Sequence, residues 1–462
     1  MGSEREASKD TTAKPLLLLL LCGYLSVVAR AGDAHTIYKV LAIGSQKAEA
    51  VCAEPQVTPS SSSGATVPLT HRYGPCSPSP STDGPSIAEL LRRDQLRAEY
   101  AEQKFYSTRG NDELEQSAVT VPTNLGDTLD TLEYVITVAI GTPAVTQTMI
   151  IDTGSDVSWV HCTSSNGSVP FDPVKSTTYV PFSCGSAPCT QLGEEGNGCS
   201  SSECQYIVKY LDGSNTTGTY GSDTLVLTAS ETVPNFQFGC SHSAGGFDDQ
   251  TDGLMGLGGD VESLVSQTAA TYGKAFSYCL PETSSSPGFL TLGAPNSTAG
   301  FVTTPMLRSQ TVPTIYGILL EDIAVDGKLL GISPTVFING SVMDSGTVIT
   351  RLPTRAYSAL RSAFRAGMTD YKRAPALSLL DTCYDFTGLN NISIPTVALV
   401  FDGGAVVDLV PNGIMISVSD SAGCLAFGAS SRLSLIGNVQ QRAFEVLHDV
   451  GKSVFGFRSG AC

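Results

Sequence analysis

Two four-residue segments of the chain carry an aspartate in the same pattern. They read Asp152-Thr153-Gly154-Ser155 and Asp344-Ser345-Gly346-Thr347. One such tetrapeptide is weak evidence of function, because Asp, Ser, Thr and Gly often form plain turns. Two copies, 192 residues apart and at equivalent places in two halves of the chain, indicate a catalytic pair instead.

Two carboxylates that share one water molecule can hydrolyse a peptide bond. The ionised carboxylate activates the water as a general base, and the protonated one polarises the carbonyl oxygen. Like charges about 3 Å apart do not both ionise cheaply, so such a pair keeps one proton. We therefore expect Asp152 and Asp344 to hydrolyse peptide bonds in acid.

The residues that follow each aspartate can orient its carboxylate and hold the two loops together. The glycine of each motif lets the backbone approach the carboxylates closely. The hydroxyls of Ser155 and Thr347 can donate hydrogen bonds to the carboxylates and fix their orientation. Thr153 and Ser345 can bond across to the other loop and hold the two loops together.

Each aspartate follows an apolar run that predicts a buried strand. The runs are residues 149–151 and 342–343. Residues 134–140 alternate and stop at a Gly-Thr-Pro turn, which predicts another strand, and residues 316–325 have the same character in the second half.

An apolar-apolar-glycine segment follows each aspartate at a similar distance. These segments, residues 254–256 and 435–437, end 104 and 93 residues after their aspartates. A duplication of this length predicts two similar lobes. The Ser-, Pro- and Gly-rich residues 281–300 are the expected junction.

The composition favours short strands over long helices. The chain has 462 residues, which is too long for one ordinary core, and 46 of them are Gly while only one is Trp. We expect a mainly all-β protein with a few short helices.

The charge excludes a nucleic-acid binder. The net charge is −17, whereas such proteins present a basic surface. Residues 119–462 hold 15 Lys and Arg against 30 Asp and Glu, and residues 1–118 hold 12 against 14. The acidity therefore lies in the larger second part.

A basic helix is predicted ahead of this acidic part. Residues 87–105 have helical periodicity and carry Arg92, Arg93, Arg97 and Lys104. The simplest interpretation is a solvated helix in a linker. We favour a pro-segment, residues 32–118, that covers an acidic cleft as an intramolecular inhibitor.

The N-terminus has the features of a secretory signal peptide. Residues 15–29 are apolar, and Ala29-Arg30-Ala31 resembles a small-x-small cleavage site, so residues 1–31 are assigned to the signal. No later segment is expected to span a membrane, and no stable membrane association is expected. Secretion to the apoplast is expected, with vacuole and plastid as alternatives.

Cysteine usage fits an oxidising compartment. Ten of the 13 Cys lie after residue 119, which suggests disulfides. Paired CxxC motifs are absent and His is scarce, so no metal and no other cofactor are expected. In a secreted chain, five sequons become candidate glycosylation sites: Asn166, Asn215, Asn296, Asn339 and Asn391.

From residue 130 to the C-terminus the chain resembles the pepsin family of aspartic proteases. The twin motifs carry the resemblance, and three further matches support it. Trp159 resembles the tryptophan near the substrate flap, and Tyr210 resembles the flap tyrosine. The two apolar-apolar-glycine segments resemble the strands that cross behind each catalytic loop. Strand packing remains the simpler role for Tyr210, and core packing for Trp159.

The resemblance implies a bilobal fold of two pseudo-symmetric β lobes, residues 119–295 and 296–462. It implies a monomeric endopeptidase, made as a zymogen, that acts on protein or peptide substrates. Within the family the chain is most similar to the nepenthesin-like plant branch, because of a Cys-rich insertion that holds Cys184, Cys189, Cys199 and Cys204.

Three features depart from that branch. Only Cys162 follows the tryptophan, where several Cys are common. Leu211 stands in the flap, where Gly is common and where Leu can stiffen the hairpin. The sequon at Asn215 also lies on the flap, where a glycan would hinder substrate entry.

The resemblance also suggests a set of structural disulfides. The suggested pairs are Cys162–Cys240, Cys184–Cys204, Cys189–Cys199, Cys279–Cys462 and Cys383–Cys424.

The main alternative function is a binding protein on the same fold. Some plant relatives have lost the protease motif and inhibit cell-wall glycosidases. Such proteins usually lack a catalytic aspartate or the flap tyrosine, and this chain retains all three residues. A glycosidase would not need twin motifs in duplicated lobes. A serine peptidase is disfavoured because no G-x-S-x-G motif is present, and a cysteine peptidase because every Cys after residue 119 has a plausible disulfide partner.

Overall fold

The computed structural model describes residues 38–42, 51–53, 64–80, 84–107, 134–162, 170–210, 214–247 and 251–462. The predicted signal peptide lies outside these residues. Among the helices of the described part, none is both long and apolar enough to cross a membrane. Residues 38–462 form one compact unit.

One 15-stranded sheet dominates the described residues. From one edge to the other, its strands are β14 (Val302–Pro305), β30 (Val454–Ser459), β29 (Phe444–Asp449), β12 (Ala275–Cys279), β13 (Gly288–Leu292), β2 (Thr66–His71), β3 (Tyr134–Ile140), β4 (Val145–Asp152), β11 (Gly253–Gly256), β5 (Trp159–His161), β10 (Glu231–Gly245), β9 (Asn215–Thr228), β8 (Glu203–Lys209) and β7 (Gly196–Ser200), while β6 (Val180–Pro181) pairs with β9. Strands from both halves of the chain therefore share one sheet.

Four smaller sheets complete the β structure of the described residues. The first holds β15 (Gly317–Ile318), β18 (Ser341–Met343), β28 (Ser434–Ile436), β19 (Thr350–Pro353) and β27 (Phe427–Ser430). The second holds β17 (Lys328–Leu329), β16 (Leu320–Val325), β23 (Val397–Phe401) and β24 (Ala405–Asp408). The third holds β20 (Lys372–Ala374), β21 (Cys383–Asp385), β26 (Ala422–Leu425) and β25 (Met415–Ser419), and the fourth pairs β1 (Tyr38–Ala42) with β22 (Asn391–Pro395).

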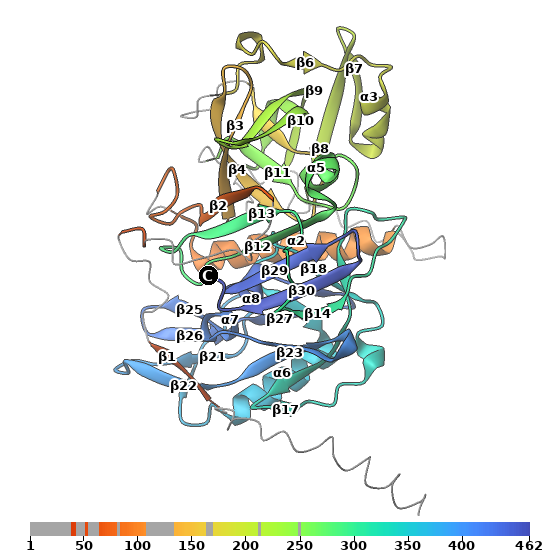
Figure 1. Ribbon diagram of the computed structural model, residues 1–462. Helices are drawn as coiled ribbons and strands as arrows, with labels where there is room; N and C mark the ends of the chain where they lie inside the picture. The colour runs from red at the N-terminus through yellow and green to blue at the C-terminus, as the bar shows by residue number, and fades with distance from the viewer. Residues whose placement is uncertain are drawn as a thin grey trace, which may run out of the picture. The chain divides into compact units, whose positions relative to one another are not determined.

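Most helices are short, as the composition predicted. They are α2 (Ile87–Ser107), α3 (Ala187–Gln191), α4 (Leu264–Gln267), α5 (Ala269–Tyr272), α6 (Thr354–Ala366), α7 (Pro411–Ile414) and α8 (Asn438–Gln441). The longest, α2, is drawn in orange between the yellow and green strands of the N-terminal lobe and the blue strands of the C-terminal lobe (Figure 1). Helix α2 includes all of residues 87–105, where the basic helix was predicted. The predicted all-β bilobal class is confirmed.

The internal repeat appears as the same strand arrangement behind each aspartate. In the first half β11 runs parallel to β4, with Gly256 opposite Asp152. In the second half β28 runs parallel to β18, with Ile436 opposite Met343. Both predicted apolar-apolar-glycine segments therefore lie beside a catalytic strand.

The predicted strand over residues 134–140 is confirmed as β3. Although its sequence alternates, Val135 and Ile136 are both almost fully buried, because the two faces of the strand are covered by different apolar clusters, one that includes Val135 and one that includes Ile136. The predicted strand over residues 316–325 is split into β15 and β16. The predicted lobe boundary, between residues 295 and 296, falls between β13 and β14 and stays a prediction.

The described residues before residue 108 are built into the fold. Strand β2 lies between β13 and β3, and its side chains Val67 and Leu69 are buried. Strand β1 pairs with β22 of the second half. A disulfide that the sequence reasoning did not consider, Cys52–Cys76, closes this segment.

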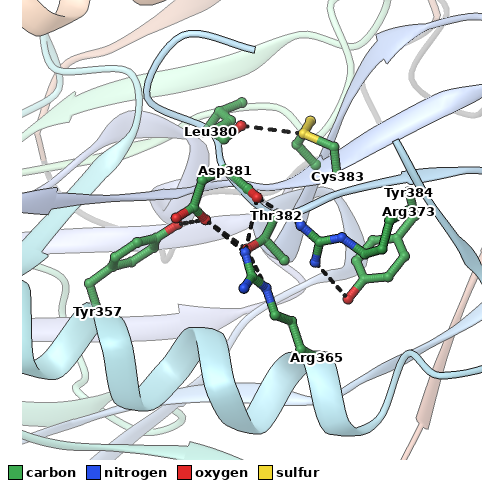
Figure 2. Close-up of a disulfide and its surroundings, with 9 residues drawn as sticks. Tyr357, Arg365, Arg373, Leu380, Asp381, Thr382, Cys383 and Tyr384 are labelled. Atoms are coloured by element: carbon green, nitrogen blue, oxygen red, sulfur yellow. Dashed lines mark hydrogen bonds and ion pairs between the residues drawn. A yellow bond between two sulfur atoms is a disulfide. The ribbon is translucent and has the colours of Figure 1, made fainter. Parts of the chain in front are cut away.

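Six disulfides are present in the described residues. Three match the suggested pairs: Cys162–Cys240, Cys279–Cys462 and Cys383–Cys424. The last joins residues directly opposite one another on β21 and β26. Figure 2 shows the surroundings of Cys383, where Tyr357 and Arg365 of α6 point toward Asp381.

The suggested nested pairing in the Cys-rich insertion is wrong. The structure pairs Cys184 with Cys199 and Cys189 with Cys204. Cys204 is fully buried, and Cys189 packs against the same apolar cluster, whereas Cys199 is exposed. Burial therefore selects the pairs: the two inward-facing sulfurs join, and so do the two outer ones.

Candidate active site

The two aspartates lie together at the ends of their strands. Asp152 is the last residue of β4, and Asp344 follows β18 directly. Both are almost completely buried, with exposed fractions of 1% and 3%. Two acidic groups from strands that are 192 residues apart in sequence thus occupy one buried site.

Each carboxylate receives the same two hydrogen bonds from its own motif. Gly154 N donates to Asp152 Oδ1 at 3.0 Å, and Ser155 Oγ donates to Asp152 Oδ2 at 2.8 Å. In the second motif, Gly346 N donates to Asp344 Oδ1 at 3.0 Å, and Thr347 Oγ1 donates to Asp344 Oδ2 at 2.6 Å. These bonds fix the orientation of both carboxylates.

The two loops are also bonded to each other. Thr153 N donates to Ser345 Oγ at 3.2 Å, and Ser345 N donates to Thr153 Oγ1 at 3.0 Å. This reciprocal pair crosses between the lobes. A Cβ atom on Gly154 would lie 3.3 Å from Asp344 Oδ1, so a bare glycine keeps room for the opposing carboxylate.

An arginine of α2 lies between the aspartates. Arg97 Nη2 donates to Asp152 Oδ1 at 3.0 Å and to Asp344 Oδ1 at 2.9 Å. Its Nε donates to Asp344 Oδ2 at 3.1 Å. The arginine is 1% exposed, so its single positive charge lies against both carboxylates where water has little access.

The arginine also acts on the pKa of Asp344. Burial alone would raise the pKa of Asp344. The Arg97 charge and hydrogen bond, with the bonds from Thr347 and Gly346, outweigh burial and hold that pKa below its ordinary value.

Two other basic residues of the predicted helix have ion pairs within the helix. Arg92 and Arg93 both pair with Glu89, one turn earlier on the same helix. The side chain of Lys104 lies outside the described part. Of the four predicted basic residues, Arg97 is the one that the structure brings between the aspartates.

Two acidic residues of α2 bond to the C-terminal lobe. Asp94 pairs with Arg351 Nη2 at 2.6 Å. Glu102 accepts hydrogen bonds from Ser431 Oγ and from the backbone N–H groups of Arg432 and Leu433. The sequence reasoning missed these contacts. The sequence predicted that a basic helix docks on an acidic body. In these two contacts the helix instead supplies the acidic group, and the lobe supplies the hydrogen-bond donors.

The predicted flap tyrosine and tryptophan contact each other. Trp159 Nε1 donates to the Tyr210 hydroxyl at 2.6 Å, and both rings pack edge-on against Phe247. Burial, with the nearby charge of Asp152, raises the pKa of Tyr210 well above its ordinary value, against the bond from Trp159. Tyr210 therefore stays a neutral phenol. The predicted flap residue Leu211 lies outside the described residues.

The candidate glycosylation sites differ in exposure. Asn296 and Asn391 are exposed, whereas Asn215 and Asn339 are half-buried. Asn391 lies on β22, opposite Ala42 of β1. Asn166 lies outside the described residues.

The chain resembles plant aspartic proteases over nearly its whole length. Family models described as xylanase inhibitor N-terminal and xylanase inhibitor C-terminal match residues 134–294 and 315–459. The chain is 37% identical to an aspartyl protease family protein of Arabidopsis thaliana, over 96% of this chain and 98% of the relative. It is 36% identical to aspartic proteinase nepenthesin-1 of Nepenthes gracilis, over 71% of this chain and 78% of the relative.

Solved structures show the same fold at lower identity. The crystal structure of edgp matches with a TM-score of 0.60 at 23% identity, covering 72% of this chain and 92% of that chain. The crystal structure of basic 7S globulin from soybean also has a TM-score of 0.60, at 21% identity over 72% of this chain and 92% of that chain. With the matching dyad and curated relatives, the chain belongs to the pepsin-like aspartic protease family, in its atypical nepenthesin-like plant branch, and is an aspartic-type endopeptidase.

Proposed function

We propose that the chain is the inactive precursor of an endopeptidase that works in acid, and that α2 is its intramolecular inhibitor. The bridge from Arg97 to both aspartates carries this proposal, because it occupies the place where a substrate water would bond to both carboxylates. Arg97 Nη2 is 3.0 Å from Asp152 Oδ1 and 2.9 Å from Asp344 Oδ1. A water bound there would be in reach of both oxygens.

Once α2 leaves, the dyad carries out hydrolysis as one unit. The ionised carboxylate takes a proton from the water as the water oxygen bonds to the peptide carbonyl carbon. The protonated carboxyl gives its proton to the carbonyl oxygen, which forms a tetrahedral intermediate. Proton transfer to the amide nitrogen then lets the C–N bond break, and the hydroxyls of Ser155 and Thr347 hold the carboxylates throughout.

Acid is the expected trigger of conversion. Protonation of the dyad removes the charges that hold Arg97, so docking of α2 weakens as the pH falls. We expect the cut to fall near residues 115–120. Incubation of the precursor at pH 3 to 7, followed by N-terminal sequencing and a peptide assay, tests this. A fully active product that still begins near Gly32 would contradict it.

Secretion is proposed as the route of the chain, with the apoplast as its destination. The six disulfides of the described residues support an oxidising compartment. The chain is proposed to act as a monomer and to carry glycans at some of its five sequons. Mass spectrometry of the protein from apoplastic fluid, with and without glycosidase treatment, tests these points.

A non-catalytic binding protein is the second candidate. The xylanase inhibitor descriptions of the matching family models favour it. The paired hydrogen bonds on Asp152 and Asp344 count against it, because a binding protein needs no oriented dyad. Cleavage of a denatured protein that pepstatin blocks would exclude this candidate.

A further inference from the structure

The groups of the C-terminal lobe that bind Asp94 form a receptor for a carboxylate. Val348 N donates to Asp94 Oδ1 at 2.6 Å, and Ile349 N donates to Asp94 Oδ2 at 3.2 Å. Arg351 Nη2 donates to Oδ2 at 2.6 Å. Two backbone N–H groups and a guanidinium thus hold one carboxylate by charge-assisted hydrogen bonds.

This receptor is a continuation of the catalytic loop. Val348 and Ile349 follow directly on the Asp344 motif, and Arg351 lies on β19. On the α2 side, Asp94 is one helical turn before Arg97, an axial rise of about 4.5 Å. An extended peptide advances about 3.3 Å per residue, so the receptor lies within one or two residues of the scissile bond.

Within the described residues, the bonding partners of Arg351 come from α2. Its Nη2 bonds to Asp94 and its Nη1 to Gln95, while its buried Nε has no partner. The side chain is 1% exposed. An arginine that served only to stabilise its own lobe would be expected to bond to that lobe, because a buried unpaired charge is costly.

The C-terminal lobe holds the arginine in place. Arg351 pairs with Leu435 of β28 and with Gly428 of β27. A Cβ atom on Gly428 would lie 3.2 Å from Arg351 Cδ, so the bare glycine leaves room for the arginine stem. The backbone and the stem of Arg351 are therefore held by the lobe itself.

There is also space beside the receptor. A cavity of about 340 Å³ lies between α2 and the C-terminal lobe, and Arg351 lines it. Its other walls on the lobe side include Thr354, Ser430, Leu433 and Leu435. Ser430 Oγ is buried without a partner in the described part of the chain. Departure of α2 would join this cavity to the substrate cleft.

We propose that Arg351, with the backbone N–H groups of Val348 and Ile349, is a subsite for an acidic side chain of the substrate. Asp94 of the pro-segment then occupies this subsite as a substrate mimic. The proposal rests on the proposed function, since α2 must leave before substrate binds. The substrate class is a peptide with an ionised Asp or Glu within two residues of the scissile bond.

Matched peptides test the subsite. The activated protein receives peptides with Asp, Asn, Ala or Lys at each of three positions on either side of one scissile bond. At pH 5, where Asp is mostly ionised, kcat/KM for the Asp peptide should exceed that for the Asn peptide about tenfold at one position. This ratio should shrink by pH 3, as the substrate carboxylate is protonated.

Substitutions of Arg351 test whether this residue causes the preference for the Asp peptide. In Arg351→Gln the Asp-to-Asn ratio should approach one, while Arg351→Lys should keep part of it. Arg355→Gln, an exposed position four residues away, is the matched control and should keep the full ratio. The ratio is taken within each enzyme, so a smaller folded fraction does not alter it.

The outcomes separate this proposal from the proposed function. A wild-type ratio near one at every position would overturn the subsite, and so would an unchanged ratio in Arg351→Gln. If no peptide is cleaved at all, the proposed function fails instead. Binding of the same peptides to the uncleaving Asp152→Asn variant then decides: tighter binding of the Asp peptide supports the subsite, and equal binding overturns it.

Discussion

Arg97 binds Asp344 through two parallel hydrogen bonds, from Nε to Oδ2 at 3.1 Å and from Nη2 to Oδ1 at 2.9 Å. This fork-to-fork geometry is available to the planar guanidinium of arginine and not to the ammonium of lysine. The same Nη2 also reaches Asp152 at 3.0 Å. Because all three side chains are nearly inaccessible to water, removal of Arg97 leaves the two carboxylates without their buried counter-charge.

Replacement of Arg97 should therefore release activity in the uncut precursor. Arg97→Ala removes the charge that neutralises the dyad, which weakens docking of α2 by about 3 kcal/mol or more. Arg97→Lys keeps the charge without the fork and should act more weakly. Peptide cleavage by freshly purified precursor at pH 5 measures the effect.

The control for Arg97 is Arg92→Ala on the same helix. Arg92 is partly exposed and pairs with Glu89 within α2, so its loss should change precursor activity little. Equal release of activity by both variants would show that helix charge in general, and not the bridge to the dyad, keeps the precursor silent.

Loss of either aspartate should abolish peptide hydrolysis. Asp152→Asn or Asp344→Asn leaves one carboxylate, which cannot both activate the water and supply a proton, so kcat should fall by about 10³-fold or more. Asp370→Asn, at an exposed position, is the control and should keep full activity. Near wild-type turnover by either dyad variant would rule out the shared water.

The rate of hydrolysis by the activated protein should have a bell-shaped pH dependence with its maximum in the acid range. The dyad titrates as a unit, and the state with one shared proton is the active one. Pepsin, whose dyad loses its protons in two acid steps, the upper with an apparent pKa of about 4.7, sets the scale. Peptide cleavage from pH 2 to 8 measures the profile. A maximum at neutral pH, with no effect of pepstatin, would contradict an aspartic mechanism.

Docking of α2 should have its own pH dependence. The pKa of Asp344 is lowered in the precursor, so its bond to Arg97 contributes full stability above the ordinary Asp pKa. That contribution is lost as the pH falls through the lowered pKa. The test compares a precursor that carries both Asp152→Asn and Arg97→Ala with one that carries Asp152→Asn alone, since neither can cleave itself. The difference between their thermal midpoints should shrink as the pH falls toward 2. A constant difference from pH 7 to pH 2 would contradict the linkage.

Glu262 should destabilise the protein as the pH approaches neutrality. Burial, with the nearby charges of Asp260 and Asp156, raises its pKa to about 7, and its Oε1 has no partner among the described residues. The folded state thus disfavours the ionised form, and the penalty grows between about pH 4.5 and 7. Glu262→Gln should gain about 1 to 2 kcal/mol at pH 7.5 and nothing at pH 4, as measured by thermal unfolding. A gain at pH 4 as large as at pH 7.5 would point to packing instead.

The sequence by itself determined the catalytic pair and the fold around it. Asp152 and Asp344 each end an apolar run within a repeated pattern, and β3 follows the alternation of residues 134–140. These features are local or periodic. Residue type and spacing along the chain therefore suffice to predict them.

The tertiary structure decided which of several equivalent residues are used. Four basic residues stand on the predicted helix, and among those whose side chains the structure describes Arg97 meets both aspartates, because helix rotation and packing choose the side chain. The partnership of Asp94 with Arg351 joins residues 257 apart, and the pairing of Cys184 with Cys199 depends on which sulfurs face the core. Contacts of this kind depend on three-dimensional proximity and burial, which residue type and spacing do not specify.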